Sequence, residues 1–249
     1  MNSRARNTLG KLALYGAAII WGTSFFLVKN QMDVFPPDRL LAMRFTVAAS
    51  LLALVFYKKM RSSSLSDIWR SAVLGAILAV ASLMQAFGIT DTTPGKNAFL
   101  TAIYCVLVPF MFWLVKRRRP ETKSFIAAML GLVGIGLISL TENLTIGWGD
   151  SLTLAGGVLY AAHIVGIATL GRDVDPVRSV VFQFATAAII FWAVDVVTPS
   201  QPAQVAPADW LVMLYLAVFP TATGFLLQLV GQKFAPPAGA SLILSLESV

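Results

Sequence analysis

Long apolar runs constrain this chain more than any other feature of its sequence. A hydrocarbon core about 30 Å thick needs roughly 20 apolar residues per helix to cross it. The 249 residues contain eight runs of this kind and the start of a ninth. Only 12% of the residues are charged and 57% are hydrophobic, whereas soluble chains have about a quarter of their residues charged. We therefore expect an integral membrane protein whose surface contacts lipid.

The runs are expected to be helices, because an open strand edge cannot face lipid with its backbone groups unpaired. The alternation of polar and apolar residues that is typical of a membrane β-barrel is absent. The sequence thus predicts an all-α integral membrane protein. The predicted spans are 12–28, 39–57, 68–88, 95–115, 124–140, 151–170, 177–197 and 209–231, with the start of another from 237.

The distribution of basic residues predicts the orientation. With the N-terminus inside, fifteen of the 19 lysines and arginines fall in cytoplasmic segments. Three fall outside, namely Lys29, Arg39 and Lys96, and Arg44 lies within a span. Because cytoplasmic loops of membrane proteins are enriched in Lys and Arg, we expect a multi-pass protein of the cell membrane with a cytoplasmic N-terminus. The same rule explains the net charge of +7 without nucleic acid as a partner.

Two internal echoes indicate a repeat. At an offset of 139, five residues of the second span match residues of the seventh: Pro37, Arg39, Phe45, Ala48 and Ala49 fall on Pro176, Arg178, Phe184, Ala187 and Ala188. At an offset of 143, four residues of spans three and four match spans eight and nine: Gln85, Gly88, Pro94 and Val106 fall on Gln228, Gly231, Pro237 and Val249. The unit is five spans, and an odd number reverses direction across the membrane. We expect an inverted repeat of two five-helix modules, 12–140 and 149–249, the second of them incomplete.

Inverted repeats are typical of secondary transporters, in which the substrate binds near the midplane between the halves and rocking of the halves gives alternating access. The sequence therefore predicts a permease for a small organic solute. The loops are too short for a soluble domain, and no Gly-x-x-x-x-Gly-Lys-Ser/Thr loop occurs, which argues against an ATP-driven pump. A non-transporting membrane scaffold or sensor, and a channel, are the alternatives.

Short motifs carry a family resemblance over nearly the whole chain. They are Trp21-Gly-Thr-Ser-Phe25, Arg44-Phe45, Ala98-Phe-Leu-Thr with Val-Leu-Val-Pro109, and Leu246-Glu-Ser-Val249. In order and spacing they resemble the EamA-type modules of the drug/metabolite transporter superfamily, with Ser248 where that pattern has proline. The resemblance implies ten spans in two five-helix modules and the export or uptake of small metabolites or drug-like solutes. By this count, residue 249 falls within the ninth span.

Depth in the membrane selects candidate substrate-binding residues, because the midplane lies about ten residues in from either face. Six polar or aromatic residues reach that level: Trp21, Ser24, Tyr104, Tyr160, His163 and Glu247. The repeat pairs them as Trp21 with Tyr160, Ser24 with His163, and Tyr104 with Glu247. Aromatic and polar groups from both halves are therefore expected to converge at one level.

The acidic and imidazole groups each allow two interpretations. An ionised side chain at the bilayer centre is costly and is usually paired, protonated or directed into a cavity. Glu247 could couple transport to protons or bind a substrate amine, or it could be a protonated carboxyl that joins the two halves by a hydrogen bond. His163, the one histidine of the sequence, could relay protons near neutral pH or could pack as a neutral ring.

The remaining candidates are basic, amide and aromatic. Arg44 could bind an anionic group of the substrate, or it could extend outward or pair with a carboxylate. Its repeat mate Gln183 is polar too, so that level is predicted to line a cavity. Trp21, Tyr104 and Tyr160 could stack on an aromatic or cationic substrate, or they could serve only packing.

We expect no enzyme activity, no cofactor and no metal. Gly147-Trp-Gly-Asp150 matches the Gly-x-Gly-Asp pattern of intramembrane aspartyl proteases. That chemistry requires two carboxylates that share a proton in a buried site. Asp150 is predicted at the outer interface, and no Tyr-Asp partner occurs at membrane depth.

Overall fold

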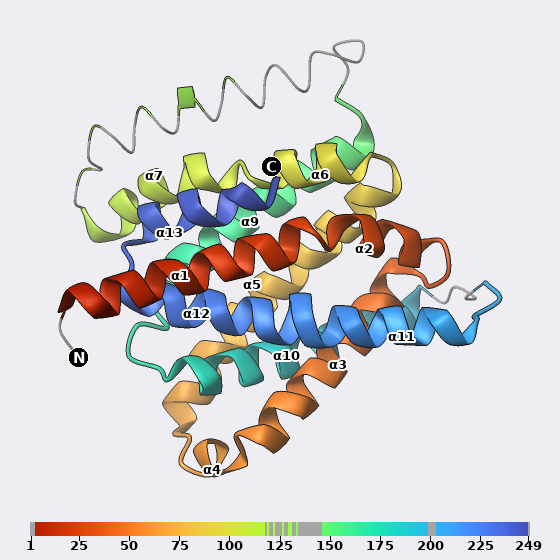
Figure 1. Ribbon diagram of the computed structural model, residues 1–249, viewed down its shortest axis with the longest axis horizontal. Helices are drawn as coiled ribbons and strands as arrows, with labels where there is room; N and C mark the ends of the chain where they lie inside the picture. Colours follow the sequence, from red (N-terminus) through yellow and green to blue (C-terminus); the bar gives the residue numbers. More distant parts are fainter. Residues whose placement is uncertain are drawn as a thin grey trace.

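The computed structural model describes residues 3–117, 119, 122, 126, 129–130, 133, 146–198 and 203–248. Across these residues the regular structure is helical, with no strand. Most helices lie side by side along one axis of the molecule (Figure 1). The predicted all-α class is confirmed. The span predicted at 124–140 lies mostly outside the described residues.

The helices follow one another with short connections. Their bounds are α1 Ser3–Gly22, α2 Phe25–Met32, α3 Pro37–Val55, α4 Tyr57–Met60, α5 Leu65–Thr90, α6 Pro94–Thr101, α7 Tyr104–Lys116, α9 Trp148–Thr169, α10 Pro176–Val197, α11 Pro207–Leu216, a π-helical segment Ala217–Gly224, α12 Phe225–Phe234, α13 Pro237–Leu244 and a 3₁₀ turn Ser245–Ser248.

Among the described residues, six stretches of helix are long and apolar enough to cross a membrane. They are Ala5–Met32, Leu65–Thr90, Pro94–Lys116, Trp148–Thr169, Pro176–Val197 and Pro207–Phe234. Each coincides with a predicted span. The remaining span predicted in this region, 39–57, corresponds to the 19-residue helix α3, whose polarity comes from Asp38, Arg39 and Arg44.

Local sequence explains where the helices begin. Proline occupies the first turn of α3, α6, α10, α11 and α13, where its missing N–H leaves no bond unmade and its fixed φ suits a helix. At α5, Ser64 accepts from the Asp67 N–H, and the Asp67 carboxylate accepts from the Ser64 N–H. Such a capping box satisfies two otherwise unpaired backbone donors.

Three of the spans are interrupted within their length. The first breaks between α1 and α2, the fourth between α6 and α7, and the eighth at the π-helical segment Ala217–Gly224. Helices α6 and α13 each have eight residues, and both their first and last residues differ by 143 positions. The offset found in the sequence therefore recurs in the bounds of the helices.

Contacts between spans also occur in corresponding pairs. Helix α5 packs on α9 and α12 packs on α1, while α7 packs on α9 and α13 packs on α1. Counted along the chain, the span of α12 is five after that of α5, and the span of α9 is five after that of α1, so the α5–α9 contact corresponds to the α12–α1 contact. By the same shift the α7–α9 contact corresponds to the α13–α1 contact, and the α3–α10 contact corresponds to itself. Helices α7 and α13 lie side by side and run in opposite directions (Figure 1). A two-fold relation between five-span units would produce this pattern.

Glycines allow α5 to approach its neighbours at backbone distance. A Cβ atom added to Gly75 would lie 2.5 Å from the carbonyl oxygen of Gln183 in α10. One added to Gly88 would lie 2.7 Å from the carbonyl oxygen of Gly149 in α9. Small residues permit such close packing between membrane helices. Helix α5 is therefore fixed against both α9 and α10.

Aromatic rings fill the space between α3, α10 and α12. The Phe45 ring packs edge-on against Phe184 and Phe191, with both centroid distances 5.0 Å. Phe225 from α12 contacts Phe184 in the same manner at 5.7 Å. Such geometries add about 0.5–1.5 kcal/mol per pair beyond burial, so this cluster helps to hold the two halves together.

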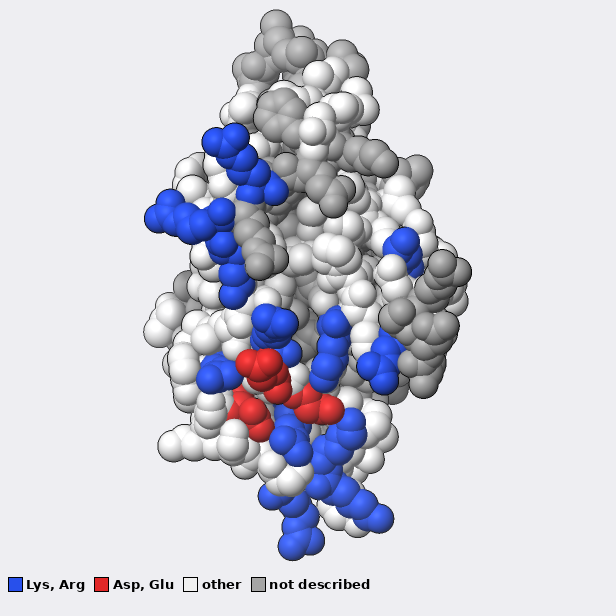
Figure 2. All heavy atoms as spheres, turned by 90° about the vertical axis from the view of Figure 1, so that its left-hand side faces the viewer, with Lys and Arg blue, Asp and Glu red and all other residues white. Residues whose placement is uncertain are grey.

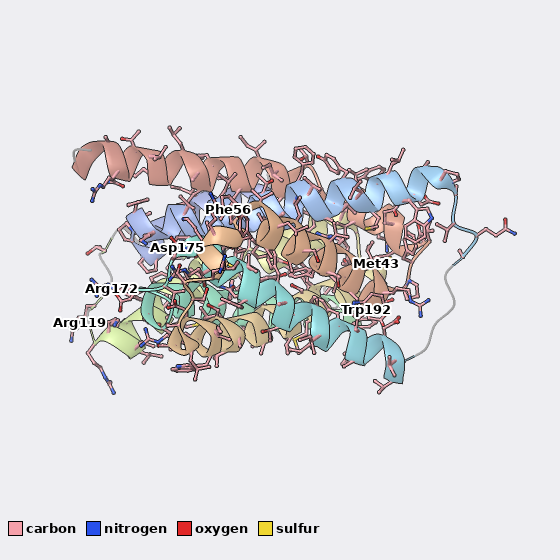
Figure 3. The ribbon with its side chains drawn as sticks, turned by 90° about the horizontal axis from the view of Figure 1, so that it is seen from below. Met43, Phe56, Arg119, Arg172, Asp175 and Trp192 are labelled. Atoms are coloured by element: carbon pink, nitrogen blue, oxygen red, sulfur yellow. The ribbon has the colours of Figure 1, made fainter. Side chains whose placement is uncertain are left out.

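Ion pairs join the helices near their ends. Arg39 contacts Asp195 at 2.8 Å and Lys96 contacts Asp150 at 2.7 Å. At the opposite end, Arg178 contacts Asp67 at 3.2 Å, and Lys59 contacts Asp175 at the same distance. Figure 3 shows these two ends of the bundle, with Arg172 and Asp175 at one and Trp192 near the other.

We expect Gly75→Ala to lower the thermal unfolding midpoint of the detergent-solubilised protein. The added methyl group would overlap the α10 backbone, and overpacking typically costs about 1–3 kcal/mol. Gly95→Ala is the matched control, because no atom lies within 4 Å of a Cβ at that position. Equal unfolding midpoints for the two variants would contradict the close approach.

Candidate functional site

A central cavity of about 100 Å³ lies between the two halves of the chain. Its lining comes from all of the spans in the described part of the chain except α10. Six of the eight predicted substrate-binding residues line it: Trp21, Ser24, Arg44, Tyr104, Tyr160 and Glu247. The structure thus brings these six together at one place, and their contact with a substrate stays a prediction.

His163 and Gln183 do not line this cavity. They are fully buried, and His163 Nε2 lies 2.7 Å from Gln183 Oε1. Because the Gln183 amide nitrogen donates to Ser179 Oγ at 2.8 Å, its oxygen is the atom facing the ring and accepts from Nε2–H. The pair connects α9 to α10 behind the cavity, which corresponds to the packing alternative for His163.

Tyr104 and Glu247 form a hydrogen bond inside the cavity. Tyr104 Oη donates to Glu247 Oε1 at 2.9 Å, and both side chains are buried. Each lies just after an eight-residue helix, α6 or α13, so the two broken spans meet through corresponding residues. The second carboxyl oxygen of Glu247 is available to accept a proton, or a hydrogen bond from a ligand.

Arg44 is buried beside the π-helical segment. Its Nε and Nη2 atoms donate to Thr221 Oγ1 at 3.2 and 3.0 Å. Thr221 in turn donates to the carbonyl oxygen of Leu216, five residues earlier, at 2.8 Å. The hydroxyl proton is thereby directed away from the guanidinium, which leaves the oxygen as an acceptor for Arg44.

Arg44 makes no bond to a carboxylate within the described part of the chain. Two acids near the ends of spans, Asp150 and Asp195, bind Lys96 and Arg39 instead. Glu142, a further acid near the end of a predicted span, lies outside the described residues. A buried charge is normally paired or satisfied by hydrogen bonds, so the cavity presents a cationic group suited to an anionic ligand group.

Trp21 is held against the same π-helical segment. Its Nε1 atom donates to the carbonyl oxygen of Pro220 at 2.8 Å, and its ring packs edge-on against Phe225 at 4.9 Å. A Cβ atom added at Gly224 would lie 2.5 Å from Trp21 Nε1. Ser24 donates to the carbonyl oxygen of Trp21 at 2.8 Å, where the first span breaks, so its hydroxyl bonds the backbone.

Tyr160 belongs to a polar network on another wall of the cavity. Its hydroxyl donates to Gln85 Oε1 at 3.0 Å and lies 3.2 Å from Ser82 Oγ. Gln85 Nε2 donates to Thr101 Oγ1 at 3.0 Å. This network connects α5, α6 and α9, and it fixes the orientation of the Tyr160 ring.

Sequence reasoning missed several polar residues that line the cavity. They are Ser82, Gln85, Asn97, Thr101 and Gln228. Asn97 Oδ1 and Gln228 Oε1 are buried without a hydrogen-bond partner among the described residues. The sequence contained a signal for the amide residues, because an amide in an apolar span needs a hydrogen-bond partner. The selection of candidate residues by their depth at the midplane did not include them. A solute in the cavity could donate to both oxygens.

The chemical character of the cavity follows from these groups. A guanidinium and a carboxyl group face the same space, with unpaired amide oxygens and aromatic rings around them. Within the described residues, no cluster of three or more His, Cys, Asp or Glu side chains could hold a metal ion. The arrangement is suited to binding a small polar organic molecule.

We expect Thr221→Val to destabilise the fold while Thr221→Ser does not. Valine removes the acceptor of Arg44, and hydrogen bonds to charged groups contribute about 1.5–3 kcal/mol. Serine keeps the hydroxyl. Thermal unfolding in detergent measures both variants, and equal losses of stability would contradict the role assigned to the hydroxyl.

Two relatives of this chain are named as transporters. An uncharacterized transporter of Archaeoglobus fulgidus is 27% identical over 238 residues, covering 96% of this chain and 74% of the relative. The uncharacterized inner membrane transporter YedA of Escherichia coli is 23% identical over 210 residues, covering 83% of this chain and 69% of the relative. A protein crystal structure superposes with a TM-score of 0.76 over 96% of this chain and 84% of the other, at 16% identity, which supports the fold.

The family match covers both halves of the chain. The EamA-like transporter family matches residues 8–140 and 147–249, which confirms the resemblance seen in the sequence motifs. Family and relatives also indicate a transporter rather than an enzyme. This chain belongs to the EamA-like transporter family and is a multi-pass membrane transporter.

Proposed function

We propose that this protein is a secondary transporter that moves a small organic metabolite or drug-like solute by alternating access. The observation that carries the proposal is the central cavity, which both halves of the chain line and which contains Arg44 and Glu247. The proposed partners are the small-molecule substrate and membrane lipid, with no nucleic acid.

The proposal treats residues 12–140 and 149–249 as two inverted modules. Its support is the common offset of the bounds of α6 and α13, together with the corresponding contacts α5–α9 and α12–α1. In such proteins one module rocks against the other and exposes the site to each side in turn. The bias of basic residues supports a cytoplasmic N-terminus.

Four side chains of the cavity have a role in this proposal. Arg44 binds an anionic group of the substrate through the fork of its guanidinium. Glu247 either accepts a proton that drives transport or binds a protonated amine of the substrate. The rings of Trp21 and Tyr160 provide flat walls for an aromatic or cationic part of the solute.

Flux into proteoliposomes tests the proposal. Vesicles containing the purified protein are incubated with a labelled metabolite extract, and we expect saturable, protein-dependent uptake of at least one solute. Flux that rises linearly with concentration would indicate a channel instead. A correctly folded protein without flux of any solute would support the scaffold or sensor alternative.

Once a solute is found, Arg44→Gln is expected to reduce its flux at least tenfold if the solute carries an anionic group, because the cavity then loses its cation. Arg61→Gln removes the same charge from an exposed position and should leave flux within twofold of wild type. The initial rate of uptake measures both. A similar decrease in both variants would assign the effect to overall charge.

Glu247→Gln separates the two roles of the carboxyl group. If Glu247 accepts the driving proton, the variant loses the pH dependence of flux, because the amide does not titrate. Asp33→Asn, which removes an exposed acid, should retain that dependence. Initial rates between pH 5 and pH 8 measure the difference, and unchanged pH dependence in Glu247→Gln would exclude proton coupling through this group.

A further inference from the structure

A second cavity, of about 600 Å³, lies at the end of the bundle where α7, α9 and α12 finish and α13 begins. Three basic residues line it, namely Lys116, Arg172 and Lys233, and none of its described lining residues is acidic. Figure 2 shows that lysine and arginine side chains gather on this end of the molecule. Figure 3 places Arg172 at the same end.

A buried glutamine in this cavity lacks partners. Gln232 is 6% exposed, and neither Nε2 nor Oε1 has a hydrogen-bond partner among the described residues. Burying an unpaired amide costs free energy, so a bound group that both accepts and donates would stabilise it. An oxyanion that carries a hydroxyl group, such as hydrogen phosphate, has both capabilities.

The first turn of α13 adds backbone donors to the cavity. Pro237 at the start of this helix lines the cavity, and the preceding Pro236 provides no side-chain cap. The next two N–H groups, of Ala238 and Gly239, precede the first residue that can bond within the helix. A helix N-terminus with uncapped donors attracts anions, and no atom lies within 4 Å of a Cβ at Gly239.

The acids of the α9–α10 connection are Asp173 and Asp175, and neither lines the cavity. Asp173 is exposed. Asp175 accepts from Lys59 at 3.2 Å and from the N–H of Val177 at 2.9 Å. Partial burial raises the pKa of Asp175, but the hydrogen bond and charge of Lys59 outweigh it and hold the pKa below its usual value. This carboxylate is thus ionised and already paired, so it does not neutralise the three basic residues.

The position of the three cations on one cavity distinguishes them from other basic residues at this end. The positive-inside rule accounts for basic residues near helix ends but does not require them to surround a hollow. Nor does it account for a buried amide with no partner. Cations, a free amide and helix N–H groups together form the donor set of a phosphate site.

We propose that this second cavity binds a phosphate-type oxyanion through Lys116, Arg172, Lys233, the Gln232 amide and the first turn of α13. The oxyanion belongs either to an anionic lipid headgroup or to a soluble phosphate compound, because both carry the same oxyanion chemistry. The proposal does not depend on transport by the central cavity.

Calorimetric titration of the purified protein in maltoside detergent tests this site at constant ionic strength. The probes are inorganic phosphate and dihexanoylphosphatidylglycerol, and dihexanoylphosphatidylcholine is the zwitterionic control. We expect saturable binding of one molecule of either phosphate or phosphatidylglycerol per chain. Binding of phosphate alone identifies a soluble ligand, and binding of the anionic lipid alone identifies a headgroup. Absence of saturable binding for both, or equal binding of the choline lipid, would overturn the proposal.

Two matched triple variants assign the binding to the cavity. Lys116→Gln, Arg172→Gln and Lys233→Gln together should weaken binding at least tenfold. The control, Lys11→Gln, Lys58→Gln and Arg61→Gln, removes the same charge from residues that do not line the cavity and should change affinity less than twofold. Equal weakening in both would show general electrostatic attraction and overturn the site.

Gln232→Leu keeps the charge and approximate volume of the side chain and removes its amide. We expect it to weaken binding several-fold while the unfolding midpoint stays equal to or above that of wild type, because an unpaired polar group is removed. Unchanged affinity would exclude the amide from the site. Because binding is measured without flux, this outcome is independent of whether the protein transports a solute.

Discussion

The packing at the centre of this structure depends on the hydrogen bonds that the buried guanidinium of Arg44 requires. It bonds Thr221, and that contact depends on the π-helical segment, whose i→i+5 spacing lets Thr221 donate to Leu216. The same segment contains Pro220, whose carbonyl oxygen receives Trp21 Nε1. The π-helical segment therefore contains the hydrogen-bond acceptor of the Arg44 guanidinium and also positions the Trp21 ring at the wall of the cavity. Such segments are frequent at functional sites.

The two halves of the chain meet through a pair of residues separated by the offset of 143 found in the sequence. Tyr104 and Glu247 are 143 positions apart and form one hydrogen bond. Helices α6 and α13, which precede them, have equal length. The side chains that follow these two short helices meet in one space, the central cavity. The positions at which α6 and α13 end therefore determine the cavity as much as the chemistry of its side chains does.

Apolar run length predicted the spans well, because the hydrophobic thickness of a bilayer fixes the length of a helix that crosses it. It could not predict the interruptions, which depend on tertiary contacts such as the bond between Trp21 and Pro220. A uniform helical period carried across Ala217–Gly224 also misplaces the face of α12, since the π segment changes the rotation per residue. Depth alone likewise could not tell that His163 turns toward Gln183 and away from the cavity.

Among the described residues Arg44 bonds a hydroxyl and no carboxylate, and this has an electrical consequence. A unit charge that crosses the whole membrane changes energy by about 2.3 kcal/mol per 100 mV, and a charge buried between the faces experiences part of that field. A conformational cycle that exposes Arg44 first to one face and then to the other would change the fraction of the membrane potential that this charge experiences. The rate of such a cycle would depend on membrane voltage even when the solute carries no net charge.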